Sequence, residues 1–261
     1  MRDVAEKDIK TALVTGASSG IGKAIAKMLT EEGYIVYGIG RTFAEKGLET
    51  FFEEKTMSAD NVVSAGNTIS AGVFRPVTLD LLETEKLNQF LDEVKDEIDV
   101  LVNCAGVGYY GLHEELSEKK IKEIIRTNLE APILITNKLL REMKKKGGTI
   151  VNISSVTAEE VNPHGAAYGA AKAGLTSFTR SIFQEARKHN VRVFNIEPDM
   201  TDTKLYRNAD FEADTSDEMA FLAPEDVACA VKFALSQRDG VVVTDIRLTP
   251  QIKRIRRKKD L

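Results

Sequence analysis

A tyrosine and a lysine stand four positions apart in the segment Tyr168-Gly-Ala-Ala-Lys172. On a helix these two positions lie on one face, so the spacing places a phenol beside an ammonium group. A free tyrosine has a pKa of about 10 and is a poor base at neutral pH. A neighbouring positive charge favours the phenolate, so we expect the pKa of Tyr168 to fall toward the range that a general acid and base needs. The pair alone occurs by chance in many helices, and it becomes specific only with partners elsewhere in the chain.

Residues 11–26 read TALVTGASSGIGKAIA, which combines a short strand, three glycines and the start of an amphipathic helix. Glycine lets the turn bend sharply and lets backbone N–H groups approach a phosphate. The helix N-terminus adds a partial positive charge at the same place. The strand before and the helix after are the context that a dinucleotide site requires. We therefore expect a pyrophosphate to bind over this turn, against Gly16, Ser19, Gly20, Ile21 and Gly22.

The second expected strand ends in YIVYGIGRT, without the carboxylate that would accept a hydrogen bond from the adenosine ribose. Gly40 takes that position and Arg41 follows it. A guanidinium group grips a 2′-phosphate with two charge-assisted hydrogen bonds. The segment therefore predicts NADP(H) as the cofactor, with Ser18 as a further contact to the phosphate. The alternative interpretation of Arg41 is a solvated arginine at the end of a strand.

Three motifs together resemble those of the classical short-chain dehydrogenase/reductase family: T-G-x-x-x-G-I-G, N-C-A-G at 103–106 and Y-x-x-x-K. The resemblance runs along nearly the whole chain. It implies an oxidoreductase that transfers a hydride between the nicotinamide and a carbonyl/alcohol pair. It also implies that Ser155, thirteen residues before Tyr168, orients the substrate oxygen, with Ser154 as the neighbouring candidate. Lys172 would lower the Tyr168 pKa and bind the nicotinamide ribose.

The same resemblance implies two further kinds of site residue. Asn128, in IIRTNLEAP, would sit at a local break in a long helix and help hold a water that links to the lysine. Further residues would contact the cofactor: Asp80, Leu81, Asn103, Ala105, Gly106, Tyr168, Lys172, Pro198, Thr201 and Thr203. For Asp80 the alternative is a helix cap. Two positions depart from the family pattern. Cys104 replaces an asparagine and is interpreted as a small apolar residue, and Asp199 replaces a glycine, which puts the geometry of that loop in question.

Short β-branched runs alternate along the chain with longer helical patterns. This alternation predicts a single α/β domain, a Rossmann-type doubly wound parallel sheet of about seven strands with helices on both faces and ligands at the carboxyl ends of the strands. Strands are expected at 11–15, 34–40, 73–79, 100–104, 149–154, 191–196 and 241–248. Helices are expected at 20–32, 44–55, 83–97, 117–145, 165–189 and 224–236.

The predicted domain spans 1–251, with a surface insertion at 57–72, a substrate lid at 199–222 and a basic tail at 252–261. The tail holds six of the 36 Lys and Arg residues, and the formal net charge of the 261-residue chain is −4. Because the tail is basic and the whole chain is negative, the rest of the chain is acidic. An acidic protein surface does not suggest nucleic-acid binding. We expect the tail to be solvated and partly disordered. The alternative is that it anchors the protein to an anionic partner or lipid surface.

The remaining composition fits a cytoplasmic protein that binds no membrane. No apolar run approaches the length of a membrane span, the N-terminal segment lacks an apolar secretory core, and there are two cysteines. Three scattered histidines predict no metal site. The apolar side chains of the two longest helices predict a homo-oligomer, a dimer or tetramer, because the family forms its main contact there; they include Ile121, Ile124, Ile125 and Leu129.

The substrate is expected to be a small carbonyl or alcohol compound held under an acidic lid. The lid's carboxylates are Asp210, Glu212, Asp214, Asp217 and Glu218, and candidates for lining the pocket are Tyr109, Tyr110, His164, Tyr206 and Phe211. A 3-oxoacyl-carrier reductase is an alternative within the same enzyme class. It ranks lower, because an acidic lid would repel an acidic carrier. A catalytically silent NADP-binding regulator is the alternative from a different class.

Overall fold

The computed structural model describes residues 9–43 and 72–258. Its centre is a parallel sheet of seven strands in the order β3-β2-β1-β4-β5-β6-β8. The strands are β1 Thr11–Thr15, β2 Ile35–Gly40, β3 Val73–Thr78, β4 Ile98–Asn103, β5 Gly148–Ile153, β6 Val191–Pro198 and β8 Asp245–Leu248. The order runs outward from β1 in both directions, which confirms the predicted doubly wound sheet.

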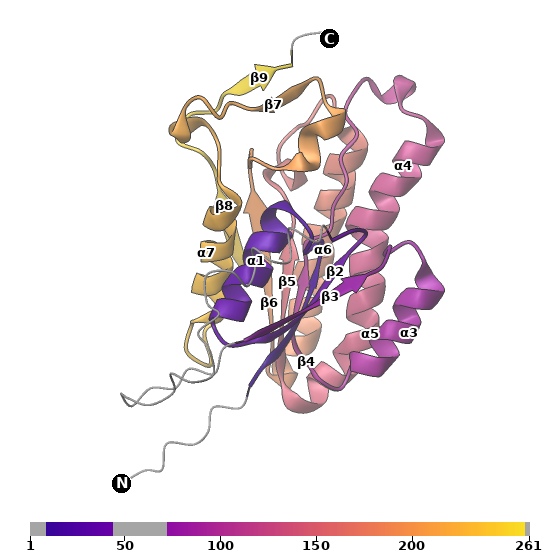
Figure 1. Ribbon diagram of the computed structural model, residues 1–261, viewed down its shortest axis with the longest axis vertical. Helices are drawn as coiled ribbons and strands as arrows, with labels where there is room; N and C mark the ends of the chain where they lie inside the picture. The colour runs from indigo at the N-terminus through magenta and orange to yellow at the C-terminus, as the bar shows by residue number, and fades with distance from the viewer. Residues whose placement is uncertain (1–8, 44–71, 259–261) are drawn as a thin grey trace.

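Helices cover both faces of this sheet (Figure 1). Their bounds are α1 Gly20–Glu31, α3 Thr84–Val94, α4 Glu118–Ile125, α5 Ala131–Lys146, α6 Ala166–Ala186 and α7 Pro224–Leu235. One buried apolar cluster joins α1 and α7 to one face, with Ile25 and Val231 fully buried. A second cluster joins α3, α5 and the end of α6 to the other face, with Leu91 and Leu139 in its centre. Apolar side chains on both faces explain why the strands read as nearly continuous hydrophobic runs.

Most predicted elements are confirmed, with ends that shift by a few residues. The strand expected at 241–248 is shorter, because only Asp245–Leu248 pairs with β6. The helix expected at 117–145 is divided into α4 and α5 by a π-helical turn, η2 Arg126–Glu130. This turn contains Asn128, so the break that the resemblance implied is present. The helix expected at 44–55 and the insertion at 57–72, apart from its last residue, lie outside the described residues.

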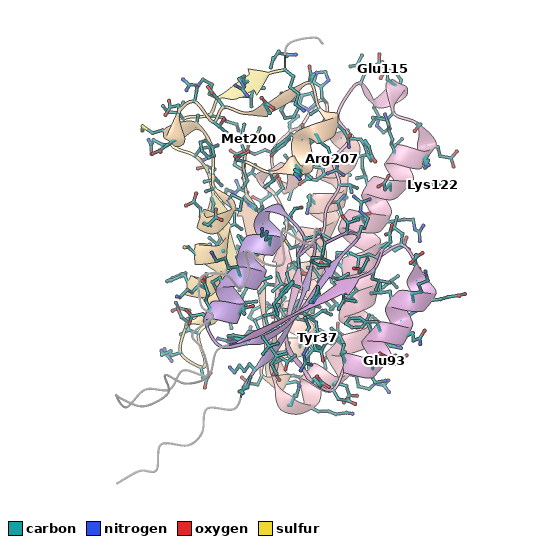
Figure 2. The ribbon with its side chains drawn as sticks, viewed as in Figure 1. Tyr37, Glu93, Glu115, Lys122, Met200 and Arg207 are labelled. Atoms are coloured by element: carbon teal, nitrogen blue, oxygen red, sulfur yellow. The ribbon has the colours of Figure 1, made fainter. Side chains whose placement is uncertain are left out.

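The segment after β6 rises over the carboxyl ends of the strands. It contains the short helices η5 Lys204–Asn208 and η6 Glu218–Ala220 and the strand β7 Phe211–Ala213. Figure 2 shows Met200 and Arg207 in this segment, above the sheet. The strand β9 Ile255–Arg257 pairs antiparallel with β7. The expectation of a partly disordered tail is therefore wrong as far as residue 258, because the tail completes a two-stranded sheet with the lid.

No helix within residues 9–43 and 72–258 is long and apolar enough to cross a membrane.

Candidate active site

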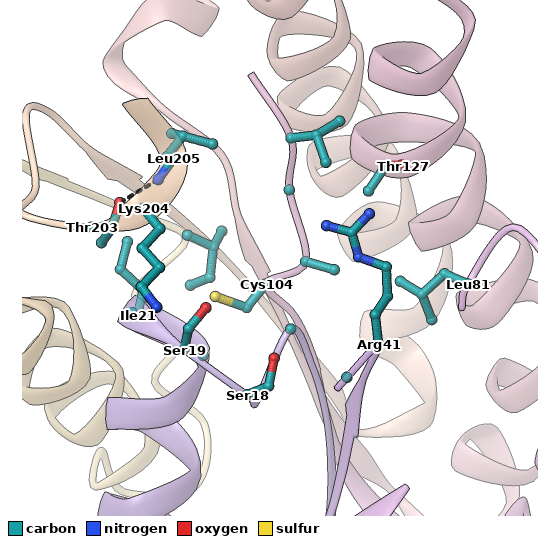
Figure 3. Close-up of a pocket in the computed structure, with 18 of the residues that line it drawn as sticks. Ser18, Ser19, Ile21, Arg41, Leu81, Cys104, Thr127, Thr203, Lys204 and Leu205 are labelled. Atoms are coloured by element: carbon teal, nitrogen blue, oxygen red, sulfur yellow. Dashed lines mark hydrogen bonds between the residues drawn. The ribbon is translucent and has the colours of Figure 1, made fainter. Parts of the chain in front are cut away.

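A cleft of about 1230 Å³, open to solvent on one side, lies at the carboxyl ends of the central strands (Figure 3). It is lined by nearly all the residues that the sequence predicts for cofactor and catalysis. These are Gly16, Ser18, Ser19, Gly20, Ile21, Gly22, Arg41, Asp80, Leu81, Ala105, Gly106, Ser155, Tyr168, Lys172, Pro198, Thr201 and Thr203. Residues from more than 180 positions of sequence thus converge on one site.

The glycine turn between β1 and α1 has no room for side chains. Gly16 and Gly20 have φ angles of +73° and +53°, which L side chains rarely adopt. An added Cβ at Gly16 would come within 2.8 Å of Ala105 Cα, and one at Gly22 within 2.3 Å of the Gly16 carbonyl oxygen. The first turn of α1 carries no acidic residue. A bare turn at a helix N-terminus fits the pyrophosphate of a dinucleotide in both shape and charge.

Thr15 connects this turn to the end of β4. Its hydroxyl oxygen accepts hydrogen bonds from the backbone N–H groups of Cys104, at 3.0 Å, and Ala105, at 3.1 Å. These bonds hold the 104–106 backbone against the glycine turn. Burial raises the pKa of Cys104 to about 12, so the thiol stays protonated and is not a nucleophile.

Arg41 reaches into the cleft from the end of β2 (Figure 3). One of its terminal nitrogens lies 3.8 Å from the carboxylate of Glu123 on α4, which also accepts a 2.8 Å hydrogen bond from the Tyr109 hydroxyl. An added Cβ at Gly40 would lie 2.8 Å from Ser18 Cβ. A carboxylate at position 40 would therefore displace Ser18, which explains in steric terms why glycine stands there.

Asp80 follows the end of β3 and also lines the cleft. One of its carboxylate oxygens accepts from the backbone N–H of Leu82 at 2.9 Å. The N-cap of α3 is Glu83, so Asp80 shapes the turn before the helix and does not cap it directly. Among the described residues, no hydrogen-bond donor contacts its second oxygen, which is therefore available to a ligand amino group.

Tyr168 and Lys172 share one face of α6, and both are buried at the base of the cleft. The Lys172 ammonium lies 5.6 Å from the centre of the Tyr168 ring and donates a 2.8 Å hydrogen bond to the Ile153 carbonyl. Burial lowers the pKa of Lys172 to about 8. Burial also raises the pKa of Tyr168, while a hydrogen bond with Ser155 opposes this effect.

Within the described residues the Tyr168 pKa therefore shifts upward, opposite to the lowering expected from the neighbouring lysine. The phenol is almost completely removed from water, and this desolvation outweighs every nearby group that favours the phenolate. The protonated phenol is the form that donates a proton in the reduction direction.

The structure distinguishes between the two serines that follow β5. The Ser155 oxygen accepts hydrogen bonds from the backbone N–H of Thr157, at 3.2 Å, and from its hydroxyl, at 3.0 Å, which leaves the serine's own proton for its hydrogen bond with Tyr168. Ser154 instead donates to the Lys172 carbonyl at 3.0 Å, or shares a proton with Thr176 Oγ1 at 2.8 Å. Ser154 thus braces β5 against α6, and Ser155 is the serine placed to act on a substrate oxygen.

Two predicted site residues do not line the cleft. The Asn128 side chain is fully buried; its N–H groups donate to the carbonyls of Val107 and Ile124 at 2.9 and 2.8 Å, and its oxygen accepts from the Val107 N–H. No side-chain N–H of Asn128 remains for a water. Asn103 donates to Asn152 at 2.8 Å within the sheet, so its side chain braces neighbouring strands. Both asparagines position the cleft backbone.

The loop that follows β6 tolerates Asp199 without strain. Among the described residues with side chains, a positive φ angle occurs only at Asn190, so position 199 does not require glycine. The Asp199 carboxylate accepts from the Met200 N–H at 2.8 Å, and its carbonyl accepts from the Thr201 hydroxyl at 2.9 Å. These bonds fold the loop so that Thr201 and Thr203 line the cleft.

Aromatic rings pack around Tyr168, and one of them, Tyr206, lines the cleft with it. The ring of Tyr110 lies 6.0 Å from that of Tyr168, 5.9 Å from that of Tyr206 and 5.1 Å from that of Phe211. Tyr206 gives the cleft an aromatic wall, and Tyr110 and Phe211 pack behind it. Tyr109 instead packs by α4, and His164 is exposed in a turn, where its carbonyl accepts from the Gly111 N–H.

The carboxylates of the lid are paired with the C-terminal segment. Arg254 binds Asp214 at 2.6 Å and Asp217 at 2.9 Å. Arg257 binds Asp210 at 2.8 Å, and Arg256 pairs with Glu212. Four of the five expected lid carboxylates are thus balanced by arginines. The expectation that an acidic lid would repel an acidic carrier loses its basis, because the tail compensates the charge.

Because these ion pairs hold the lid to the C-terminal segment, added salt or neutral substitution of the arginines should increase the mobility of the lid. In the triple variant Arg254→Gln, Arg256→Gln, Arg257→Gln, we expect proteolysis within 200–222 to become at least about threefold faster, since four exposed pairs contribute ~0.2–1 kcal/mol each. Limited proteolysis with mass spectrometry measures this rate. A matched variant, with the exposed Lys27, Lys145 and Lys188 changed to Gln, should behave as wild type. Equal rates for all three proteins would contradict the role of the tail.

Several cleft residues were not found from the sequence. Glu123 and Thr127 enter from α4 and η2, and Lys204 and Arg207 enter from η5. A weak signal existed for two of them, because Thr127 directly precedes Asn128 and Lys204 directly follows Thr203. Glu123 and Arg207 had no such signal, because only the packing of α4 and of the lid brings them to the cleft.

Comparisons with known proteins show the family and the fold. The short chain dehydrogenase family model matches residues 10–213. A 3-oxoacyl-[acyl-carrier-protein] reductase of Vibrio cholerae is 34% identical over 236 residues, a match that covers 87% of this chain and 90% of that protein. An alcohol dehydrogenase from the archaeon Thermococcus sibiricus, solved with 5-hydroxy-NADP, has a TM-score of 0.77 at 27% identity and covers 95% of this chain and 99% of its own. A 4-hydroxyisoleucine dehydrogenase mutant solved with NADH and succinate shares the fold, with a TM-score of 0.75 at 23% identity over 93% of this chain and 98% of its own.

Proposed function

Since this chain belongs to the short-chain dehydrogenase/reductase family, we propose that it is an NADP(H)-dependent oxidoreductase acting on a carbonyl/secondary alcohol pair. The observation that carries this proposal is the convergence of Ser155, Tyr168 and Lys172 in the cleft that also holds the glycine turn. A silent nucleotide-binding regulator would not need these three groups together. Fold alone names no substrate, so the proposal rests on the site.

The nicotinamide supplies or accepts the hydride when the cofactor is bound. In the reduction direction Tyr168 donates its phenolic proton to the carbonyl oxygen of the substrate. The Ser155 hydroxyl, which hydrogen-bonds with Tyr168, would donate to the same oxygen, where negative charge develops. Lys172 keeps two N–H groups beyond its bond to the Ile153 carbonyl, and these are suited to ribose hydroxyls.

The preference for NADP(H) is supported by charge at the end of β2. Arg41 offers a guanidinium, and the space beside Gly40 is filled by Ser18 and not by a carboxylate. The Thermococcus sibiricus alcohol dehydrogenase was solved in complex with 5-hydroxy-NADP. Glu123 limits the preference, because its carboxylate lies near Arg41.

A panel of carbonyl compounds with NADPH and NADH, and of secondary alcohols with NADP⁺ and NAD⁺, tests this proposal through nicotinamide absorbance. Turnover of at least one carbonyl, faster with NADPH, is the expected result. Turnover faster with NADH would contradict the cofactor preference, and nucleotide binding without any turnover would favour the regulator.

A 3-oxoacyl-carrier reductase is the second candidate function. The relative from Vibrio cholerae carries that name, and the pairing of the lid carboxylates removes the electrostatic objection to an acidic carrier. A 3-oxoacyl thioester in the panel separates the two candidates. A kcat/KM for the carrier-bound thioester far above that for small ketones would favour the second.

We also propose that the chain forms a homo-oligomer through α4, α5 and α6. The apolar side chains of α4 and η2 are a weaker reason for this than the sequence suggested. Ile124 is fully buried, and Ile121, Ile125 and Leu129 pack against an apolar cluster of the same chain. Leu134 on α5 remains 41% exposed and offers a contact for a second copy.

Light scattering at micromolar concentration is expected to give two or four times the 28.8 kDa chain mass. Leu134→Arg should lower that mass, because it places a charge in the contact, and Leu134→Met should leave it unchanged. A wild-type monomer would refute the oligomer, and an unchanged mass for Leu134→Arg would refute this contact.

A further inference from the structure

The first part of the lid, around Thr203, lies directly on the glycine turn. An added Cβ at Gly20 would come within 3.0 Å of the Thr203 methyl group, so Thr203 is in contact with the turn itself. Thr203 also caps η5, because its hydroxyl accepts from the Leu205 N–H at 3.2 Å. The backbone at positions 203–205 is therefore held at a defined place above the start of α1.

Lys204, the first residue of η5, extends from this fixed point into the cleft. Figure 3 shows its side chain running down toward Ser19 and Ile21 at the glycine turn. Within the described part of the chain no carboxylate pairs with it, whereas Arg254, Arg256 and Arg257 of the neighbouring tail are all paired. The ammonium is thus an uncompensated positive charge beside a turn that already favours anions.

We propose that Lys204 binds the pyrophosphate of the dinucleotide from the lid side, opposite the backbone N–H groups of the glycine turn. This inference rests on the proposed function, because it requires a dinucleotide in the cleft. Lys204 lies near the start of the lid (199–222), so this ion pair also draws that part of the lid onto the bound cofactor. Lys204 is a positioning and binding residue; it takes no part in proton transfer.

The pyrophosphate is common to NADPH and NADH, whereas the 2′-phosphate belongs to NADPH alone. Loss of Lys204 should therefore weaken both cofactors by the same factor, whereas loss of Arg41 should weaken only NADPH. A structural role in lid folding would also weaken both nucleotides, but it would leave the salt dependence of binding unchanged. A role toward the substrate would raise KM for the carbonyl and leave both nucleotide affinities unchanged.

The experiment measures Kd for NADPH and for NADH, by calorimetry or nicotinamide fluorescence, with wild type, Lys204→Met, Lys204→Arg and Lys188→Met. We expect Lys204→Met to raise both Kd values about tenfold, as for one charge-assisted bond, and Lys204→Arg to retain most of the affinity. Lys188→Met, an equal change of charge on an exposed residue of η4 Arg187–His189, should bind as wild type. Added salt should weaken wild type more steeply than Lys204→Met.

Unchanged Kd values for both nucleotides in Lys204→Met would overturn this inference alone. A loss confined to NADPH would also overturn it, since Lys204 would then contact the 2′-phosphate. Wild type that binds neither nucleotide would overturn the proposed function together with this inference.

Discussion

Replacement of Tyr168 by phenylalanine is expected to lower kcat by at least ~10²-fold and to leave the Kd for NADPH nearly unchanged, because general acid catalysis contributes about that much. The hydroxyl lies at the base of the cleft, within reach of Ser155 and beside Lys172. Phenylalanine keeps the ring and its packing against Tyr110, so the loss reports proton transfer and not a collapsed site. Steady-state kinetics with the best carbonyl of the panel measures it.

Tyr37→Phe is the matched control for this prediction. Its hydroxyl donates to Glu97 and accepts from Arg75 on the exposed side of β2, away from the cleft (Figure 2). This variant removes the same atom and should keep wild-type turnover. Near-normal turnover by Tyr168→Phe would show that another group supplies the proton.

Replacement of Arg41 by alanine is expected to weaken NADPH binding about ten- to a hundredfold and to change NADH binding little. Charge-assisted bonds to a phosphate contribute roughly 1.5–3 kcal/mol each, which corresponds to that range. The variant also leaves the Glu123 carboxylate without its 3.8 Å partner, so the remaining negative charge adds to the loss for NADPH. Titration of both nucleotides measures the two Kd values.

Arg41→Lys is the control, because it keeps the charge and loses the planar fork, and it should give an intermediate Kd. An equal loss of affinity for NADPH and NADH in Arg41→Ala would mean that the arginine supports the structure of the cleft and does not bind the 2′-phosphate. A switch toward NADH by Gly40→Asp requires Ser18→Gly as well, because the Ser18 side chain occupies the space of the new Cβ.

Much of the fold follows from local chemistry. Alternating apolar strands and amphipathic helices specify a parallel sheet with two covered faces, and the observed strand order is the predicted doubly wound one. The three glycines marked the phosphate turn because no other residue fits the φ angles and contacts found there. Element ends were less certain, since hydrogen bonding to a neighbouring strand decides where β8 begins.

The candidate catalytic site was also predictable, because Tyr168 and Lys172 are one helical turn apart and Ser155 follows a strand. The direction of the Tyr168 pKa was not predictable. Sequence spacing shows which charge lies nearby, whereas desolvation depends on what covers the phenol, and Tyr110 covers it from a distant segment.

The sequence by itself therefore determined the fold class and the glycine turn and indicated the candidate catalytic side chains, since each depends on residues that lie close together along the chain. Only the tertiary structure decided the partners of those side chains. Glu123 meets Arg41 across 82 positions, Lys204 reaches the glycine turn, and the basic tail neutralises the acidic lid. Contacts of this kind depend on how elements pack, and electrostatic energies depend on distance through space and on burial, neither of which spacing along the chain records.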